Sequence, residues 1–316
     1  MARQQTILMF SGQGSHYYHM GRELFEGDAT FRRWMLDLDA IVRERIGQSV
    51  LSTLYDPSRT RSDSFGRLLL THPAIFMIEV ALAQTLIARK VVPDYTLGAS
   101  MGTFAAAVVA GCVTPEDALT MLLKQASEVE ARCRSGGMIA VLSECSLLND
   151  EDFSRRCELA AENFSTHFVL SAPEEHLEPI EARLRARGVT YQRLAVGYPF
   201  HSRWFDDARE VLLAANRGIA FQKARIPIAC CACASLIEEV PDGYFWTVAR
   251  EPIRFARMIE RLESRGSYQY IDVGPAGSLA TFLKYALRPG SASRARSILN
   301  PFGGDLKNLA LAAAAA

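Results

Sequence analysis

The segment that most constrains this chain is a serine turn flanked by glycines, GASMG at residues 98–102. It follows a short apolar run and precedes the alanine-rich segment 103–110, so it joins a predicted strand to a predicted helix. In a nucleophile elbow such a turn projects the serine hydroxyl at the start of a helix, where free N–H groups stabilise negative charge. The pattern predicts an α/β fold with Ser100 as nucleophile and the Met101 N–H as an oxyanion donor. The alternative is a tight glycine turn with an incidental serine.

Other segments predict a larger α/β unit around this turn. Apolar runs at 6–10, 95–99 and 268–274 indicate buried strands. Thr114, followed by a proline and two acids, indicates the N-terminus of a helix. We expect an α/β-hydrolase-like catalytic subdomain with a parallel sheet, formed by residues 1–134 and 200–316.

The elements become smaller from about residue 136. Strand and helix signals alternate there as a strand at 136–142, an acidic polar helix, a strand at 168–173, a helix at 174–188 and a strand at 189–196. This alternation predicts a small ferredoxin-like α+β subdomain over residues 135–199.

Composition excludes some classes of partner. The chain of 316 residues is 49% hydrophobic and has a formal net charge of zero, so nothing favours nucleic acid or an anionic membrane. We expect no apolar stretch long enough to span a bilayer, and we expect a cytoplasmic monomer. Cys230, Cys231 and Cys233 have a spacing that suits no usual zinc site, so we expect a buried strand with inert thiols and no metal.

Six short motifs occur along the chain in an order that matches a known protein family. FSGQGS, THPAIFMIEVALA, GASMG, FHS, REPIRF and DVGPAG follow one another along nearly the whole chain. Together they resemble the family of malonyl-CoA:acyl-carrier-protein transacylases and polyketide synthase acyltransferase domains. That resemblance implies ping-pong acyl transfer by a Ser–His pair without an obligatory third acid or any cofactor. Its partner is an acyl carrier protein with a phosphopantetheine-linked acyl group, and coenzyme A thioesters are further candidate substrates.

The resemblance also assigns roles to individual residues. Ser100 is the nucleophile, and His201, in FHS, is the general base and acid. Gln13, in the Gly-Gln-Gly turn, helps to shape the oxyanion hole beside the Met101 amide. A backbone carbonyl from the segment 248–251 is expected to orient the His201 ring.

Two departures from the family pattern concern the substrate. Ala99 stands where the family usually has a histidine before the nucleophile. Counting without gaps, Gln125 stands where malonyl-type members carry the arginine that binds the substrate carboxylate, and the neighbouring Lys124 points elsewhere on the helix. The alternative is that another arginine has taken over this role. With Phe200 also lining it, the pocket is expected to accept acyl groups without a free carboxylate.

These changes resemble those of the free-standing acyl hydrolases found with trans-acyltransferase polyketide synthases, which cleave acyl groups such as acetyl from carrier proteins. Hydrolysis is therefore our first interpretation. The second is an acyltransferase that moves a non-malonyl acyl group onto or between carrier proteins, and a malonyl transacylase is the third, disfavoured by Gln125. An α/β-hydrolase esterase is an alternative from another class of protein, but FSGQGS has no role in such an enzyme. A catalytically silent binding module would not need both Ser100 and His201.

Further polar residues have weaker context. Arg203, Arg250, Arg254 and Lys284 lie in segments near the predicted cleft mouth, where they would dock an acidic carrier protein or stay solvated surface charges. The histidines other than His201 are expected mostly at the surface or in packing; they are His16, His19, His72, His167 and His176.

Overall fold

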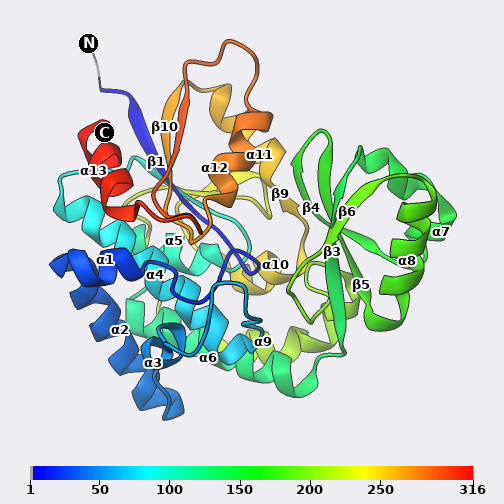
Figure 1. Cartoon of the computed structure of the whole chain (residues 1–316), viewed down its shortest axis with the longest axis horizontal. Helices are drawn as coiled ribbons and strands as arrows, with labels where there is room; N and C mark the ends of the chain where they lie inside the picture. The colour runs from blue at the N-terminus through cyan, green and yellow to red at the C-terminus, as the bar shows by residue number, and fades with distance from the viewer. Residues whose placement is uncertain (1–2, 316) are drawn as a thin grey trace.

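The computed structural model describes residues 3–315 and contains two sheets (Figure 1). The larger sheet has six strands in the order β11-β10-β1-β2-β7-β8. All neighbouring pairs are parallel except β7 and β8. Its strands are β1 (Gln5–Phe10), β2 (Tyr95–Gly98), β7 (Ile228–Cys230), β8 (Ser235–Ile237), β10 (Tyr268–Asp272) and β11 (Arg294–Ser297).

Helices cover both faces of this sheet. Leu8 and Phe10 of β1 join the core formed with α2, α4 and α5, whereas Ile7 and Met9 join the core formed with α11 and α12. Because both faces are buried, β1 is apolar at successive positions instead of alternating ones. The helical segments of this unit are α1 (Arg22–Gly27), α2 (Ala29–Ile46), α3 (Val50–Leu54), α4 (Leu68–Ala88), α5 (Gly102–Val109), α6 (Pro115–Arg132), η2 (Arg203–Ala208), α9 (Arg209–Ala215), α10 (Tyr244–Arg250), α11 (Phe255–Glu263), α12 (Ser278–Ala286) and α13 (Asp305–Ala315).

The predicted helix start at Thr114 is confirmed. Its hydroxyl accepts a hydrogen bond of 3.1 Å from the N–H of Asp117, and α6 begins at the intervening proline. This cap fixes the N-terminus of the helix that carries Gln125.

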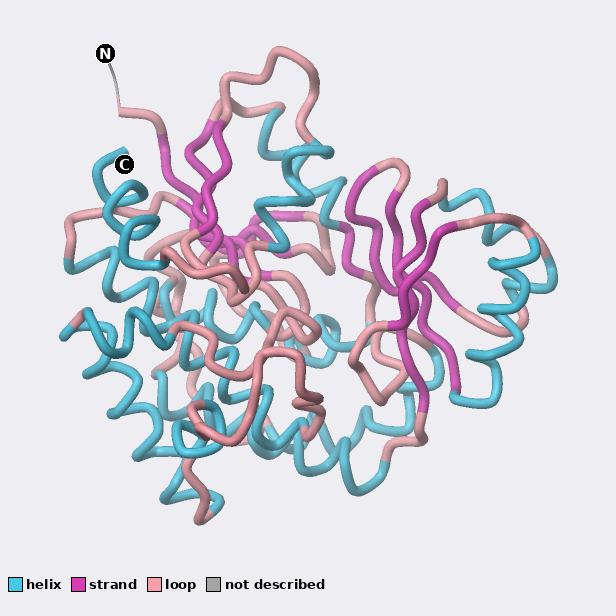
Figure 2. Tube along the Cα trace, in the orientation of Figure 1, coloured by secondary structure: helices cyan, strands magenta, loops and turns pink. Residues whose placement is uncertain are grey.

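The smaller sheet has the order β6-β3-β5-β4-β9 and lies beside the larger unit (Figure 2). Its first four strands come from one segment, and their order is that of a ferredoxin-like unit. β9 adds to β4 from outside residues 135–199, so the division at 134 and 200 stays a prediction. The elements are β3 (Gly136–Leu142), η1 (Cys145–Asn149), α7 (Glu151–Ser154), β4 (Glu158–Phe164), β5 (His167–Pro173), α8 (Glu174–Ala186), β6 (Thr190–Arg193) and β9 (Ile253–Arg254).

The prediction of an acidic polar helix after β3 is largely wrong. The structure has only the short segments η1 and α7 there, and the strand β4 follows them. The alanine-rich and acidic sequence of β4 has little intrinsic strand preference. Its pairing with β5 and β9 on its two edges determines its conformation.

Helix α4 corrects the expectation that no apolar stretch is long enough to span a bilayer. It has 21 residues and a most apolar window of mean hydropathy 1.4, which suffices by length and composition. However, 89% of that window is buried inside the protein, where α4 packs against α2, α5 and α6. A helix buried on all sides is apolar on all sides, which explains its composition.

The cysteine-rich run is only in part a buried strand. β7 ends at Cys230, and Cys231 is buried in the turn that follows. Cys233 is exposed, which contradicts the expectation for this residue, because the chain turns back into β8 at this point. Within residues 3–315, no group of His, Cys, Asp or Glu side chains is placed to hold a metal ion.

Candidate active site

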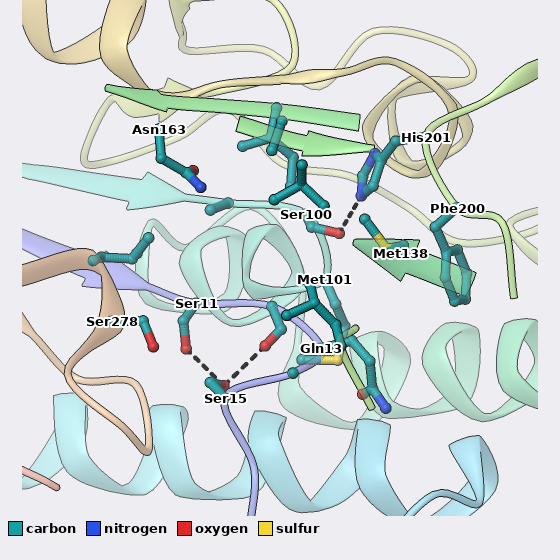
Figure 3. Close-up of a pocket in the computed structure, with 18 of the residues that line it drawn as sticks. Ser11, Gln13, Ser15, Ser100, Met101, Met138, Asn163, Phe200, His201 and Ser278 are labelled. Atoms are coloured by element: carbon teal, nitrogen blue, oxygen red, sulfur yellow. Dashed lines mark hydrogen bonds between the residues drawn. The ribbon is translucent and has the colours of Figure 1, made fainter. Parts of the chain in front are cut away.

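A cavity of about 310 Å³ lies between the large sheet and the small one (Figure 3). β1 and β2 are parallel, so their carboxyl ends meet at its floor and deliver the Gly-Gln-Gly turn and the serine turn together. α4 and α6 contribute one side chain each, and β3, β4 and β5 form a wall. Residues that carry the argument below are Gln13, His72, Ala99, Ser100, Met101, Gln125, Asn163, His167, Phe200 and His201.

The serine turn has the geometry of a nucleophile elbow. Ser100 has φ 54°, in the left-handed region, and α5 begins two residues later. A Cβ at Gly102 would lie 2.3 Å from the carbonyl oxygen of Phe10, and one at Gly98 would lie 2.6 Å from the Cα of Thr103. Both glycines are therefore required by close approach of the backbone, and the predicted strand–turn–helix is confirmed.

Ser100 and His201 are in direct contact. Ser100 Oγ lies 2.8 Å from His201 Nε2, and His201 Nδ1 lies 2.8 Å from the carbonyl oxygen of Glu251 (Figure 3 draws the first bond). Because a carbonyl only accepts, Nδ1 carries the proton and Nε2 is left to accept the serine proton. The expected orienting carbonyl from segment 248–251 is thus confirmed as that of Glu251.

His201 is held in its neutral form. The ring is 2% exposed, and the N–H of the residue donates to the carbonyl of Ala249 at 3.1 Å. Burial lowers the pKa of His201 to about 4, opposed by the Glu251 carbonyl and assisted by the positive charge of Arg250. The imidazole is therefore unprotonated near neutral pH, as a general base needs to be.

The Gln13 side chain points away from the serine (Figure 3). Its amide makes contacts of 3.1 and 3.3 Å with the hydroxyl of Thr71 on α4. The backbone N–H groups of Gln13 and Met101, in contrast, donate to no other group within residues 3–315. A Cβ on Gly12 would lie 3.0 Å from Ser100 Cβ, so the two turns are packed together. An oxyanion role for Gln13 is thus compatible with its main chain, not with its side chain.

A buried carboxyl that the sequence interpretation missed supports this loop. Glu79 on α4 is fully buried, and its Oε1 accepts the N–H of Ser11 at 2.6 Å and the Ser11 hydroxyl at 3.1 Å. Burial raises the pKa of Glu79 well above its usual value, against the effect of these hydrogen bonds. An acidic residue inside the apolar sequence FMIEVALA is the signal that would have identified it.

The substrate side of the cavity carries no formal charge. Ala99, Phe200 and Gln125 all line it as predicted, and Gln125 is 7% exposed. Among the described residues that line the cavity there is no Lys, Arg, Asp or Glu.

Two histidines expected at the surface or in packing also line this cavity. They are His72 and His167. Burial lowers the pKa of His72 to about 3, and the nearby His16 lowers it further by a smaller amount. Burial also lowers the pKa of His167. Both are therefore neutral near neutral pH. Asn163 Nδ2 lies 3.0 Å from His167 Nδ1, which gives this wall a second polar pair. Their sequence context gave no signal, because α4 and β5 reach the cavity only through tertiary packing.

Most of the basic residues considered for carrier-protein docking are paired within the chain. Arg203 contacts Glu158 at 2.7 Å, Arg250 contacts Asp206 at 2.5 Å and Arg254 contacts Glu251 at 3.2 Å. Lys284 is exposed and forms no ion pair with any residue in 3–315. The three arginines therefore have structural partners already, which leaves Lys284 as the free cation of this set.

Comparison with known proteins places the site in a family context. Residues 7–306 match the family model described as acyl transferase domain. The chain is 42% identical to the polyketide biosynthesis acyltransferase homolog PksD of Bacillus subtilis, over 97% of this chain and 95% of that protein. It is 43% identical to the homolog BaeD of Bacillus velezensis, over 95% and 93%. The acyltransferase domain from the second module of the salinomycin polyketide synthase has a TM-score of 0.87 at 26% identity, covering 98% of this chain and 72% of that one.

Proposed function

The chain belongs to the acyl transferase domain family, and from this premise we propose that it is a trans-acting acyl hydrolase of polyketide biosynthesis. It would remove acyl groups without a free carboxylate, such as acetyl, from the phosphopantetheine thioesters of acyl carrier proteins. Two relatives named as polyketide biosynthesis acyltransferase homologs align with it over nearly their whole lengths, which supports a role in polyketide biosynthesis. We further propose that it acts as a cytoplasmic monomer.

In the proposed first half-reaction, Ser100 Oγ attacks the thioester carbonyl while His201 Nε2 takes the hydroxyl proton, across the observed 2.8 Å contact. The carbonyl oxygen becomes an oxyanion, which the N–H groups of Met101 and Gln13 stabilise. Collapse breaks the carbon–sulfur bond, and His201 returns the proton to the leaving thiolate. The acyl group is now an ester on Ser100.

In the second half-reaction, His201 takes a proton from water, and the resulting nucleophile attacks the ester carbonyl. Collapse breaks the bond to Ser100 Oγ, which recovers its proton from His201, and the free acid leaves. The carbonyl of Glu251 holds the protonated form of the ring in the same orientation through Nδ1–H. A carrier-protein thiol in place of water would give transfer instead, by the same steps.

The uncharged cavity is the observation that carries the proposed selectivity. A malonyl carboxylate placed beside Gln125 would be buried without a cation, because no described lining residue is Lys or Arg. Burying an unpaired carboxylate costs on the order of several kcal/mol. An acetyl group meets no such cost, so the cavity favours non-carboxylated acyl groups. Transfer of a non-malonyl group, malonyl transfer and simple ester hydrolysis remain as the competing outcomes of the test below.

Intact mass spectrometry of loaded carrier proteins tests this proposal. The full chain is incubated with acetyl- and with malonyl-loaded carrier protein, together with an unloaded second carrier protein. Loss of acetyl as free acid, with malonyl retained, is the expected result. Appearance of acetyl on the second carrier protein would mean transfer, and rapid malonyl loading of Ser100 would overturn the selectivity argument. Coenzyme A thioesters and a simple ester, offered in parallel, show whether the carrier protein itself is needed.

A further inference from the structure

Helix α4 carries one fully buried carboxyl that contacts the loop after β1. Glu79 is 0% exposed, and its Oε1 accepts the N–H of Ser11 at 2.6 Å. The Ser11 hydroxyl lies 3.1 Å from the same oxygen and 3.0 Å from the Ser15 hydroxyl, which in turn donates to the carbonyl of Gly12 at 2.8 Å (Figure 3). The carboxyl of Glu79 is therefore linked to both limbs of the turn of residues 11–15, which contains Gln13.

This turn is pressed against the serine turn. A Cβ on Gly12 would lie 3.0 Å from Ser100 Cβ and 3.1 Å from the carbonyl oxygen of Ala99. The same helix holds the turn a second time, because the Gln13 amide contacts the hydroxyl of Thr71. The Gln13 main chain is thereby fixed between two contacts to α4, next to the nucleophile.

Glu79 lacks the partners that a charged carboxylate needs. Its Oε2 is buried and has no hydrogen-bond partner within residues 3–315, and the side chain forms no ion pair in that range. The carboxyl of Asp272 is also buried, but it accepts the N–H groups of Gly274 and Ala280 at 2.8 and 2.9 Å. A negative charge is therefore better stabilised on Asp272, and that charge disfavours a second one on Glu79. Of the two acids, Glu79 is the one that holds its proton near neutral pH.

Glu79 has no direct contact with the reacting groups. The His201 ring is oriented by the Glu251 carbonyl, and Glu79 is not among the residues that line the cavity. An acid buried behind the loop acts on the reaction only through the main chain that it holds. The group concerned is the Gln13 N–H, which donates to no other group within residues 3–315.

We propose that Glu79 is a positioning residue, which as a neutral acid holds the turn of residues 11–15 so that the Gln13 N–H stabilises the oxyanion formed at Ser100. Donors that are fixed before the reaction need no reorganisation when the negative charge develops. A neutral acid fixes the turn without placing a second negative charge behind the oxyanion, as a carboxylate would. This inference rests on the proposed function for the identity of the reaction.

Three substitutions of Glu79 separate hydrogen bonding, reach and charge. Glu79→Gln keeps an accepting oxygen without the acidic proton, Glu79→Leu removes it, and Glu79→Asp keeps the acid but withdraws it from Ser11 by one methylene. Formation of the Ser100 ester from acetyl-loaded carrier protein is followed on the full chain by quenched-flow intact mass, at increasing carrier-protein concentration. We expect Glu79→Leu and Glu79→Asp to lower the maximal rate about 10- to 100-fold at an unchanged half-saturating concentration, and Glu79→Gln to retain most of it.

Val80→Ala is the control for lost stability, because Val80 is fully buried on the same helix. It should make the protein less stable and leave the rate of ester formation unchanged. A rate in Glu79→Leu equal to that of the unmodified chain, or a change confined to the half-saturating concentration, would overturn the inference. Glu79→Gln as slow as Glu79→Leu would show that a charge is required and would refute the neutral acid. If Glu79→Leu does not fold, Glu79→Asp decides the same question.

Hydrogen exchange separates this inference from the proposed function. Exchange of the amides in segment 10–15 is measured by mass spectrometry without substrate, and it should become faster in Glu79→Leu but not in Val80→Ala. If the unmodified chain forms no Ser100 ester, the proposed function fails, and unchanged exchange in Glu79→Leu would overturn the inference as well. If the ester forms equally fast in the unmodified chain and in Glu79→Leu, the proposed function stands and only the role of Glu79 is refuted.

Discussion

The Ser100–His201 pair and the rest of the cavity lining differ in how their polar groups are satisfied. At the reacting end, Ser100, His201 and the Glu251 carbonyl form a continuous chain of two 2.8 Å contacts before any substrate arrives. Elsewhere in the cavity, His72 Nδ1 is buried without a hydrogen-bond partner within residues 3–315, and the Gln125 side chain on α6 carries no charge. The first arrangement is preorganised for the proposed attack on a thioester. The second part holds no fixed charge, and our proposal assigns the choice of acyl group to it.

Removal of the nucleophile gives the largest expected effect. Ser100→Ala should lower thioester cleavage by about a thousandfold or more, because the acyl ester can no longer form. Substrate binding and the oxyanion donors are retained, and they account for the residual activity. Release of free acid and the mass of the enzyme are measured together. Ser278→Ala is the matched control, since Ser278 lines the same cavity and its side chain bonds to no residue in 3–315. Similar losses in both variants would contradict the assignment of Ser100.

A charge at position 125 should reverse the proposed acyl preference without touching the Ser100–His201 pair. Gln125→Arg supplies a fixed cation with parallel N–H donors, and we expect malonyl loading of Ser100 to rise by about 10- to 100-fold. Gln192→Arg carries the same change at the exposed mouth and should leave malonyl loading unchanged. No gain in Gln125→Arg would show that position 125 does not meet the acyl tail.

The same comparison explains what the sequence could predict. The serine turn, its flanking glycines and the Thr114 cap follow local rules of spacing and backbone geometry, and the structure confirms them. Ser100 and His201 lie far apart in the chain, and only the ordered motifs brought them together in the prediction. Their contact is observed, whereas their catalytic roles stay predictions.

What the sequence did not reveal depends on packing between elements. Glu79 and His72 lie on α4. The apolar sequence around Glu79 marks this acidic residue as unusual, but it does not show that Glu79 supports the loop of Ser11 or that His72 reaches the cavity. The same helix was not recognised as long and apolar enough to cross a membrane, and its burial at the centre of the fold accounts for its composition. β4 was mistaken for a helix because its pairing on two edges outweighs its weak strand preference.

The rigidity of the reacting end can be tested through stability. Gly102→Ala places a Cβ 2.3 Å from the Phe10 carbonyl oxygen and 2.4 Å from that of Ser11, which are backbone atoms with no room to move. We expect a loss of about 1–3 kcal/mol in the free energy of unfolding, measured by denaturant titration. Gly197→Ala is the control, because a Cβ there meets nothing within 4 Å. Equal stability of the two variants would mean that the elbow is not held against β1.

The smallest expected effect is a pH dependence that is nearly absent. With the pKa of His201 lowered to about 4 by burial, the ring stays neutral, and kcat/KM should stay level from pH 7 down to about pH 5.5. For an imidazole with the ordinary pKa of about 6.5, the neutral fraction would fall about eightfold between pH 7 and pH 5.5. His72, with a pKa of about 3, titrates below this range and adds no step of its own. Circular dichroism across the interval checks that the fold persists. An acid limb near pH 6.5 with the fold intact would show that water reaches His201, and the reacting end would then be as open to solvent as the mouth of the cavity.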